Sequence, residues 1–77
     1  MALVPGFLMA NDKYSGNPTA RAEFDKGKVA SQSGDWKAAI AAYKKAIQLD
    51  PNFADAYEEY NYALTANAVF INRVYSK

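Results

Sequence analysis

The sequence predicts an all-α protein: a helix–turn–helix unit followed by a long C-terminal helix, preceded by an extended N-terminal tail. Apolar residues recur every three or four positions along most of the chain, as they do on one face of a helix. No segment alternates between apolar and polar residues, and turn-forming pairs divide the pattern into three parts. The chain has 77 residues, which suffice for one small domain. We expect this domain at 18–77, after an apolar tail and loop at 1–17.

The first two helices have recognisable ends. Asn17 can cap a helix and Pro18 suits its first position, so a helix is expected from 18 to 32, before a Ser-Gly pair. Asp35 can cap a second helix over 36–49, which an Asp-Pro pair ends. The large side chains of this second helix fall on one face and its lysines on the other, which predicts a helix that packs on one side.

The third helix is expected to begin after Asn52, with Asp55 three residues later in an arrangement similar to a capping box. Neither proline nor glycine follows Pro51, so the helix is expected to continue from about 53 to 75. Its core-facing stripe is predicted to comprise Phe53, Tyr57, Tyr60, Leu64, Ala68, Ile71 and Tyr75.

Composition excludes several classes of function. The nine basic and eight acidic residues are mixed along the chain, which gives no indication of a nucleic-acid partner. The sequence contains neither histidine nor cysteine, so the common zinc sites, Cys/His and Ser/His nucleophiles, thiol redox chemistry and disulfides are excluded. No pair of carboxylates, lysines or tyrosines stands out for acid–base chemistry. We therefore expect no enzyme activity, cofactor or metal.

The first ten residues, MALVPGFLMA, form an apolar tail interrupted by Pro5 and Gly6. They lack the charged start and the longer apolar run of a secretory signal, and no window reaches the roughly 20 apolar residues of a transmembrane helix. The compartment is not determined by the sequence, which favours an intracellular soluble or peripheral protein over a secreted one. The tail can cover the domain's own core or contact a partner. Its candidate residues are Leu3, Val4, Phe7 and Leu8.

The middle of the chain resembles a known repeat. The residues concerned are Gly27, Gly34, Asp35, Ala39, Tyr43, Ala46 and Pro51, whose spacing is similar to that of the tetratricopeptide repeat (TPR), a helix–turn–helix unit of 34 residues. The resemblance spans 20–64, about one and a half repeats. It implies that Gly27 and Ala39 are small where the two helices cross closely, beside Tyr43. The first helix departs from the family pattern with Glu23, Lys26 and Ala30, and Asn61 stands where a glycine is usual.

The resemblance implies a non-catalytic protein–protein interaction module, such as a scaffold, assembly factor or accessory subunit of a larger complex. Such repeats commonly bind peptides in a concave groove formed by the first helix of each pair. The matching positions here include Arg21, Phe24, Lys28, Asp55, Glu58 and Glu59. Only Lys28 fits the family's clamp for a C-terminal carboxylate, so a chaperone-tail ligand is not expected.

A second candidate surface lies on the C-terminal helix. Residues 60–72 carry no charged side chain, and the second helix is too short to cover the far end of the third. An exposed apolar patch of this kind marks an interaction site. Its residues are Tyr62, Val69, Phe70, Ile71, Val74 and Tyr75. Two alternatives stay open: a small subunit peripheral to a membrane-bound complex, contacting it through the tail, and a homo-oligomer in which unfinished repeat ends stack on each other.

Overall fold

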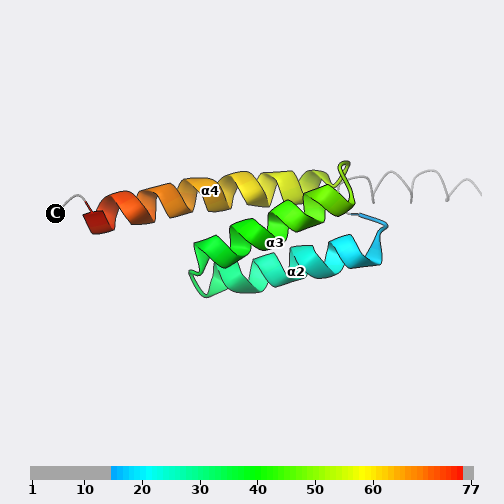
Figure 1. Ribbon diagram of the computed structural model, residues 1–77, viewed down its shortest axis with the longest axis horizontal. Helices are drawn as coiled ribbons and strands as arrows, with labels where there is room; N and C mark the ends of the chain where they lie inside the picture. Colours follow the sequence, from blue (N-terminus) through cyan, green and yellow to red (C-terminus); the bar gives the residue numbers. More distant parts are fainter. Residues whose placement is uncertain (1–14, 76–77) are drawn as a thin grey trace, which may run out of the picture.

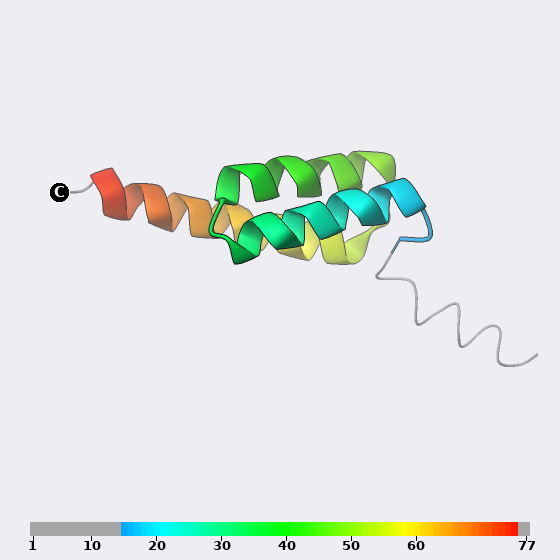
Figure 2. The same ribbon diagram turned by 90° about the horizontal axis from the view of Figure 1, so that it is seen from below.

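The computed structural model describes residues 15–75, which form three α-helices: α2 Pro18–Gln32, α3 Trp36–Leu49 and α4 Ala54–Tyr75. The described part contains no strand, and the predicted all-α fold is confirmed. Helices α2 and α3 form an antiparallel hairpin, and α4 runs back along α3 (Figure 1). Because α4 has 22 residues and α3 only 14, the C-terminal part of α4 projects beyond the α2–α3 turn (Figure 2).

Helix α2 begins and ends where the sequence predicts. The Asn17 side chain accepts hydrogen bonds from the amides of Thr19 and Ala20 at 2.9 and 3.1 Å, and thereby caps the first turn, with proline at the start. After the helix, Gly34 has a positive φ of 77°, a conformation that glycine adopts without the steric cost of a Cβ. This residue lets the chain turn sharply into α3.

Helix α3 also has the predicted bounds. One carboxylate oxygen of Asp35 accepts a hydrogen bond from the Ala38 amide at 3.2 Å, so the expected N-cap is present. Asp50, in an extended conformation, follows the last helical residue, and its amide donates to the Ala46 carbonyl. The helix therefore stops before Pro51, whose ring and missing N–H do not permit the next turn.

The start of α4 differs from the prediction by one residue. Asn52 does not cap the helix: its amide donates to the Asp50 side chain at 3.1 Å, within the turn. The carbonyl of Phe53 instead accepts from the amides of Ala56 and Tyr57 at 3.1 and 3.3 Å, and α4 begins at Ala54. The Asp50 side chain thus shapes this turn, while Phe53 is buried completely.

The hairpin core is built around Tyr43, which is fully buried. Gly27 lies directly against its ring, since a Cβ added there would come within 2.4 Å of the ring. The ring packs at a tilt against Phe24, with centroids 5.6 Å apart, and Phe24 in turn packs on Phe53 at 4.8 Å. The Tyr43 hydroxyl and the Ser31 hydroxyl share a hydrogen bond of 3.1 Å. The buried tyrosine is therefore held by packing and by one polar contact.

Helix α4 packs on α3 through a face other than the predicted one. Its completely buried residues are the alanines Ala56 and Ala63, whose small side chains let two helices approach closely. By contrast, Tyr57 and Leu64, which were predicted to face the core, are 44% and 41% exposed. Of the predicted stripe, Phe53 is buried and Tyr60 is partly buried, while the other five members are exposed. The predicted inward face is thus wrong by about a quarter turn.

The segment before α2 is tied to the turn before α4. The hydroxyl of Ser15, one of the buried residues, donates a hydrogen bond to the Asp50 carboxylate. Arg21 donates to the Ser15 carbonyl at 3.0 Å. Two positions 35 residues apart in sequence are therefore joined at the same end of the hairpin.

Candidate functional site

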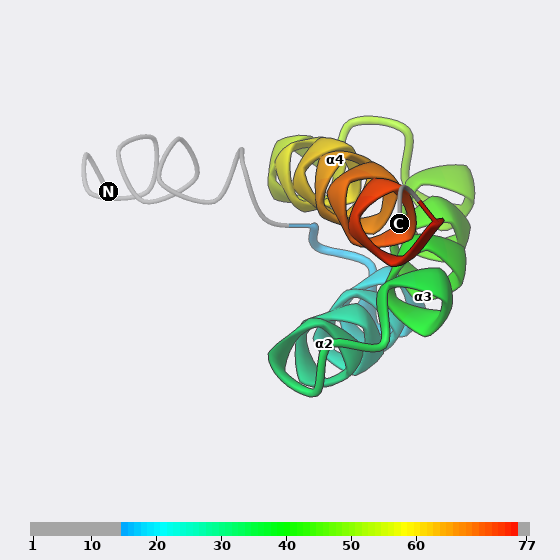
Figure 3. The same ribbon diagram turned by 90° about the vertical axis from the view of Figure 1, so that its left-hand side faces the viewer.

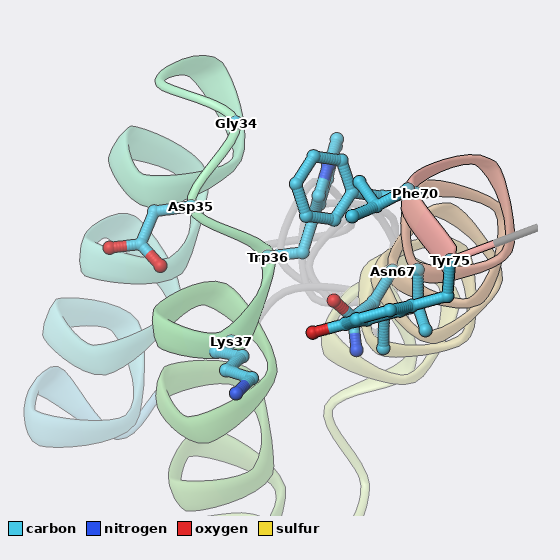
Figure 4. Close-up of a pocket in the computed structure, with 9 residues that line it drawn as sticks. Gly34, Asp35, Trp36, Lys37, Asn67, Phe70 and Tyr75 are labelled. Atoms are coloured by element: carbon cyan, nitrogen blue, oxygen red, sulfur yellow. The ribbon is translucent and has the colours of Figure 1, made fainter. Parts of the chain in front are cut away.

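Two hollows open where the projecting part of α4 passes the start of α3. The first has a volume of about 260 Å³ and lies between the α2–α3 turn and α4. It is lined by Gly34, Asp35, Trp36, Lys37, Asn67, Phe70, Ile71, Val74 and Tyr75. Figure 4 shows Trp36 and Phe70 extending toward one another from α3 and α4, while the Asp35 carboxylate points away from α4.

The second hollow, of about 390 Å³, shares Trp36 and Phe70 with the first and continues along the other flank of α4. Its lining residues are Trp36, Tyr62, Thr65, Ala66, Val69, Phe70 and Arg73. We refer to the two hollows together as the Trp36–Phe70 groove. Its charged lining residues are Asp35, Lys37 and Arg73, and the rest of the lining is uncharged.

The part that Trp36 plays in this groove was not predicted from the sequence. The pattern placed Trp36 on the core-facing side of α3, and the residue is indeed only partly exposed and packs on the core. Its ring also meets Tyr62 edge to face, with centroids 5.8 Å apart and planes at 74°. Trp36 is the first residue of α3, and α4 beside it is longer. This position could have indicated that the Trp36 side chain is only partly covered.

All six predicted residues of the C-terminal helix line the groove. Their exposed fractions are 62% for Tyr62, 51% for Val69, 55% for Phe70, 39% for Ile71, 48% for Val74 and 79% for Tyr75. They lie on two flanks of α4: Tyr62 and Val69 line the second hollow, Ile71, Val74 and Tyr75 line the first, and Phe70 borders both. Surfaces of this kind mark sites of protein contact in soluble proteins.

The predicted concave groove is only partly accessible. Phe24 was expected to line it, but this side chain is 7% exposed and belongs to the core, between Tyr43 and Phe53. The prediction for Phe24 is therefore wrong. The reason is that Phe24 lies about one turn before Gly27 on α2, toward the same core, where its ring packs on Tyr43 and Phe53.

Three charged members of the concave groove, Arg21, Lys28 and Glu59, contact residues within the protein. Lys28 on α2 and Glu59 on α4 form an ion pair at 3.7 Å, and the Lys28 ammonium lies 5.8 Å from the Phe24 ring centroid. Arg21 is held by the Ser15 carbonyl. Asp55 is partly buried and Glu58 is exposed. The ion pair links α2 and α4, and Lys28 would exchange Glu59 for any carboxylate ligand that it bound.

The four tail candidates, Leu3, Val4, Phe7 and Leu8, lie outside the described residues. Within residues 15–75, the side chains form no cluster of three or more carboxylates that could hold a metal ion. No helix in that same range is long and apolar enough to cross a membrane.

The geometry defines the class of protein. In the antiparallel hairpin, a glycine of one helix lies against a buried tyrosine of the other. A further helix then packs on the second helix of the hairpin. Helical-repeat proteins have this arrangement. Residues 27–64 match the family model described as TPR repeat. This segment is therefore a tetratricopeptide-type repeat, as the glycine, alanine, tyrosine and proline spacing indicates.

TPR repeats generally mediate protein–protein interaction, and the family is typically non-catalytic. Comparisons with the curated proteins and with the solved structures gave no match. The family thus supplies a mode of action, and the identity of the partner has to be sought in the surfaces of this chain.

Proposed function

We propose that the protein is a non-catalytic adaptor that binds another protein in the Trp36–Phe70 groove, as a small scaffold or accessory subunit of a larger complex. The observation that carries this proposal is the exposure of six large apolar side chains along α4, all of which line the groove. Burying such side chains against a partner favours binding by roughly 25 cal/mol per Å² of apolar area removed from water.

The groove has the anatomy of a binding hot spot. Aromatic side chains dominate the energetics of protein interfaces, especially when they line a hollow that a partner can fill. Trp36, Tyr62 and Phe70 provide three such rings, with Trp36 and Phe70 shared by both hollows. The expected partner inserts one apolar side chain on each side of Phe70.

The rim of the groove adds a preference of charge. Arg73 lines the second hollow, which contains no carboxylate. A partner with an acidic residue next to its apolar anchors would therefore meet a complementary cation. Rim charges of this kind govern orientation and association rate more than affinity.

Affinity capture with matched variants tests the proposal. Phe70→Glu places a charge between the two hollows and is expected to weaken partner binding about 30-fold or more, the effect of losing an interface hot spot. The control is Val29→Glu, because Val29 is an apolar residue 63% exposed on α2 and outside both hollows. Circular dichroism establishes that both variants stay helical.

The expected result is a stoichiometric protein that co-purifies with the wild type and with Val29→Glu, and is lost with Phe70→Glu. Direct titration of that protein then gives the affinity ratio. If every captured protein binds the Phe70 variant as well as the wild type, the groove is not the binding site.

A further inference from the structure

The side of α4 that was predicted to face the core forms a regular exposed stripe. It begins at Tyr57 and ends at Tyr75, and its spacing alternates between four and three residues, the heptad spacing of a coiled-coil seam. We call this set, Tyr57, Asn61, Leu64, Ala68, Ile71 and Tyr75, the 57–75 stripe. At 100° per residue its members lie within about 40° of one direction, and each of them is exposed to solvent.

The repeat itself indicates what this stripe would contact. With the 34-residue period of the family, Gly27 and Ala30 of α2 correspond to Asn61 and Leu64 of α4, since 27 + 34 is 61 and 30 + 34 is 64. On α2, Gly27 is buried against Tyr43 of α3, and Ala30 packs on the same core. On α4, the equivalent pair is exposed. The stripe is therefore the face that a following helix would cover.

The surroundings of α4 leave the stripe accessible. Glu59, which pairs with Lys28 of α2, lies about 160° around α4 from the centre of the stripe. The buried Ala56 and Ala63, which mark the contact with α3, lie about a quarter turn or more away. Figure 3, seen along the helices, shows α4 at the edge of the arrangement, with α2 and α3 both on one side of it.

The stripe is complementary to a second copy of itself that runs in the opposite direction. In an antiparallel pair of α4 helices centred at the height of residue 66, positions whose numbers sum to 132 lie opposite each other. Tyr57 then faces Tyr75, Asn61 faces Ile71, and the large Leu64 faces the small Ala68. All six positions are matched, and large side chains oppose small ones at the centre, as close helix packing requires.

The charges beside the stripe are compatible with this register. Glu58 is the charged residue nearest to the stripe, and the antiparallel arrangement sets it near the uncharged Asn72 of the second copy, with about 24 Å of helix axis between the two Glu58 residues. The helix dipoles also oppose each other in the antiparallel pair.

We propose that the 57–75 stripe is the interface of a two-fold symmetric homodimer, in which α4 of a second copy lies antiparallel on α4, in the place that a following helix takes in a longer repeat array. Asn61 is the one side chain of the stripe with a polar end group besides the tyrosines. A single asparagine in such a seam fixes register at a cost in affinity. Ile71 and Tyr75 of the stripe also line the first hollow of the groove and would be covered in the dimer, whereas the flank around Tyr62 and Val69 lies on the other side of α4 and stays open.

The mass in solution tests the dimer. Sedimentation equilibrium over a concentration series is expected to show a species twice the 8.5 kDa mass of the chain. Leu64→Glu is expected to raise the dissociation constant about 100-fold, because it buries a charge at the centre of the seam. Asn61→Leu is expected to lower it about tenfold. Val29→Glu, on α2 and away from the stripe, should leave it unchanged.

Cysteine cross-linking tests the orientation, and the sequence has no native cysteine to interfere. Tyr57 and Tyr75 are separated by about 27 Å along the helix. A protein with both Tyr57→Cys and Tyr75→Cys is expected to form a disulfide-linked dimer under mild oxidation, whereas Tyr57→Cys alone is not. Cross-linking of the single variant would demonstrate a parallel pair and overturn the proposed register.

Two further results would overturn the proposal. A monomer at every concentration would mean that no second copy binds, as expected if the protein's own residues 1–14 cover the stripe. A dimer whose dissociation constant is the same in Leu64→Glu would place the interface elsewhere. Neither result bears on binding of another protein in the Trp36–Phe70 groove, since that is measured with the Phe70 variant.

Discussion

Replacing Gly27 by alanine is expected to destabilise the protein, although alanine is the better helix former. Gly27 lies within α2 and is buried. A Cβ at this position would come within 2.4, 2.6 and 2.9 Å of three atoms of the Tyr43 ring, well inside van der Waals contact. The ring has little freedom to move away, because it is fully buried, packs on Phe24 and is hydrogen-bonded to Ser31.

The magnitude follows from two opposing effects. Glycine to alanine in a helix interior stabilises by about 1 kcal/mol when space is available. Forcing an extra methyl group into a packed core costs roughly 1–3 kcal/mol, and three contacts below 3.0 Å place this site at the upper end. The free energy of unfolding should therefore fall by about 2 kcal/mol.

Urea denaturation followed by helical circular dichroism measures this change. The matched test repeats Gly27→Ala in a Tyr43→Leu background, where the ring is absent and the alanine should be neutral or stabilising. An increase of about 1 kcal/mol in the unfolding free energy of the single variant would refute the reasoning, since it would mean that the ring yields without cost.

Three other predictions concern local contacts. Asp35→Ala removes the cap of α3 and should lower the unfolding free energy by about 1 kcal/mol in the same urea assay, with Asp35→Asn as the control that retains capping. Lys28→Met breaks the partly exposed pair with Glu59 and should cost less than about 1 kcal/mol, and less still at high salt. Burial raises the pKa of Tyr43 above the ordinary 10.0. The unfolded chain then releases this proton at a lower pH than the folded protein, so the unfolding free energy should fall as pH rises above 10.0, and fall less steeply in Tyr43→Phe.

The hairpin could be predicted from the sequence because its signals are local. Asn17 and Asp35 are capping residues, and each is used as a cap. Gly27 and Tyr43 stand at a spacing that has one physical reading, a small residue beneath a large ring at a helix crossing. The same spacing did not indicate that Phe24 would join that core, since its ring also packs on Phe53, which lies outside the two helices of the hairpin.

The orientation of α4 could not be predicted, because its sequence is apolar on more than one side. A periodicity argument selects the stripe with the largest side chains, and that selection put Tyr57 and Leu64 inside. The structure instead buries Ala56 and Ala63, because close approach of two helix backbones is favoured where side chains are small. The Trp36–Phe70 groove was missed in part for a related reason, since it depends on where the shorter α3 begins beside α4.

The bond between Ser15 and Asp50 has a consequence for how the repeat could be multiplied. The chain enters the hairpin at Ser15 and leaves it at Asp50, and the two positions touch. The residues before its first helix and after its second helix lie at the same end of the hairpin. A second hairpin can therefore follow the first directly, without a long loop across the structure. Inserting a second copy of 20–53 directly after Phe53 should therefore lengthen the protein by one repeat while the original turn and its carboxylate remain in place.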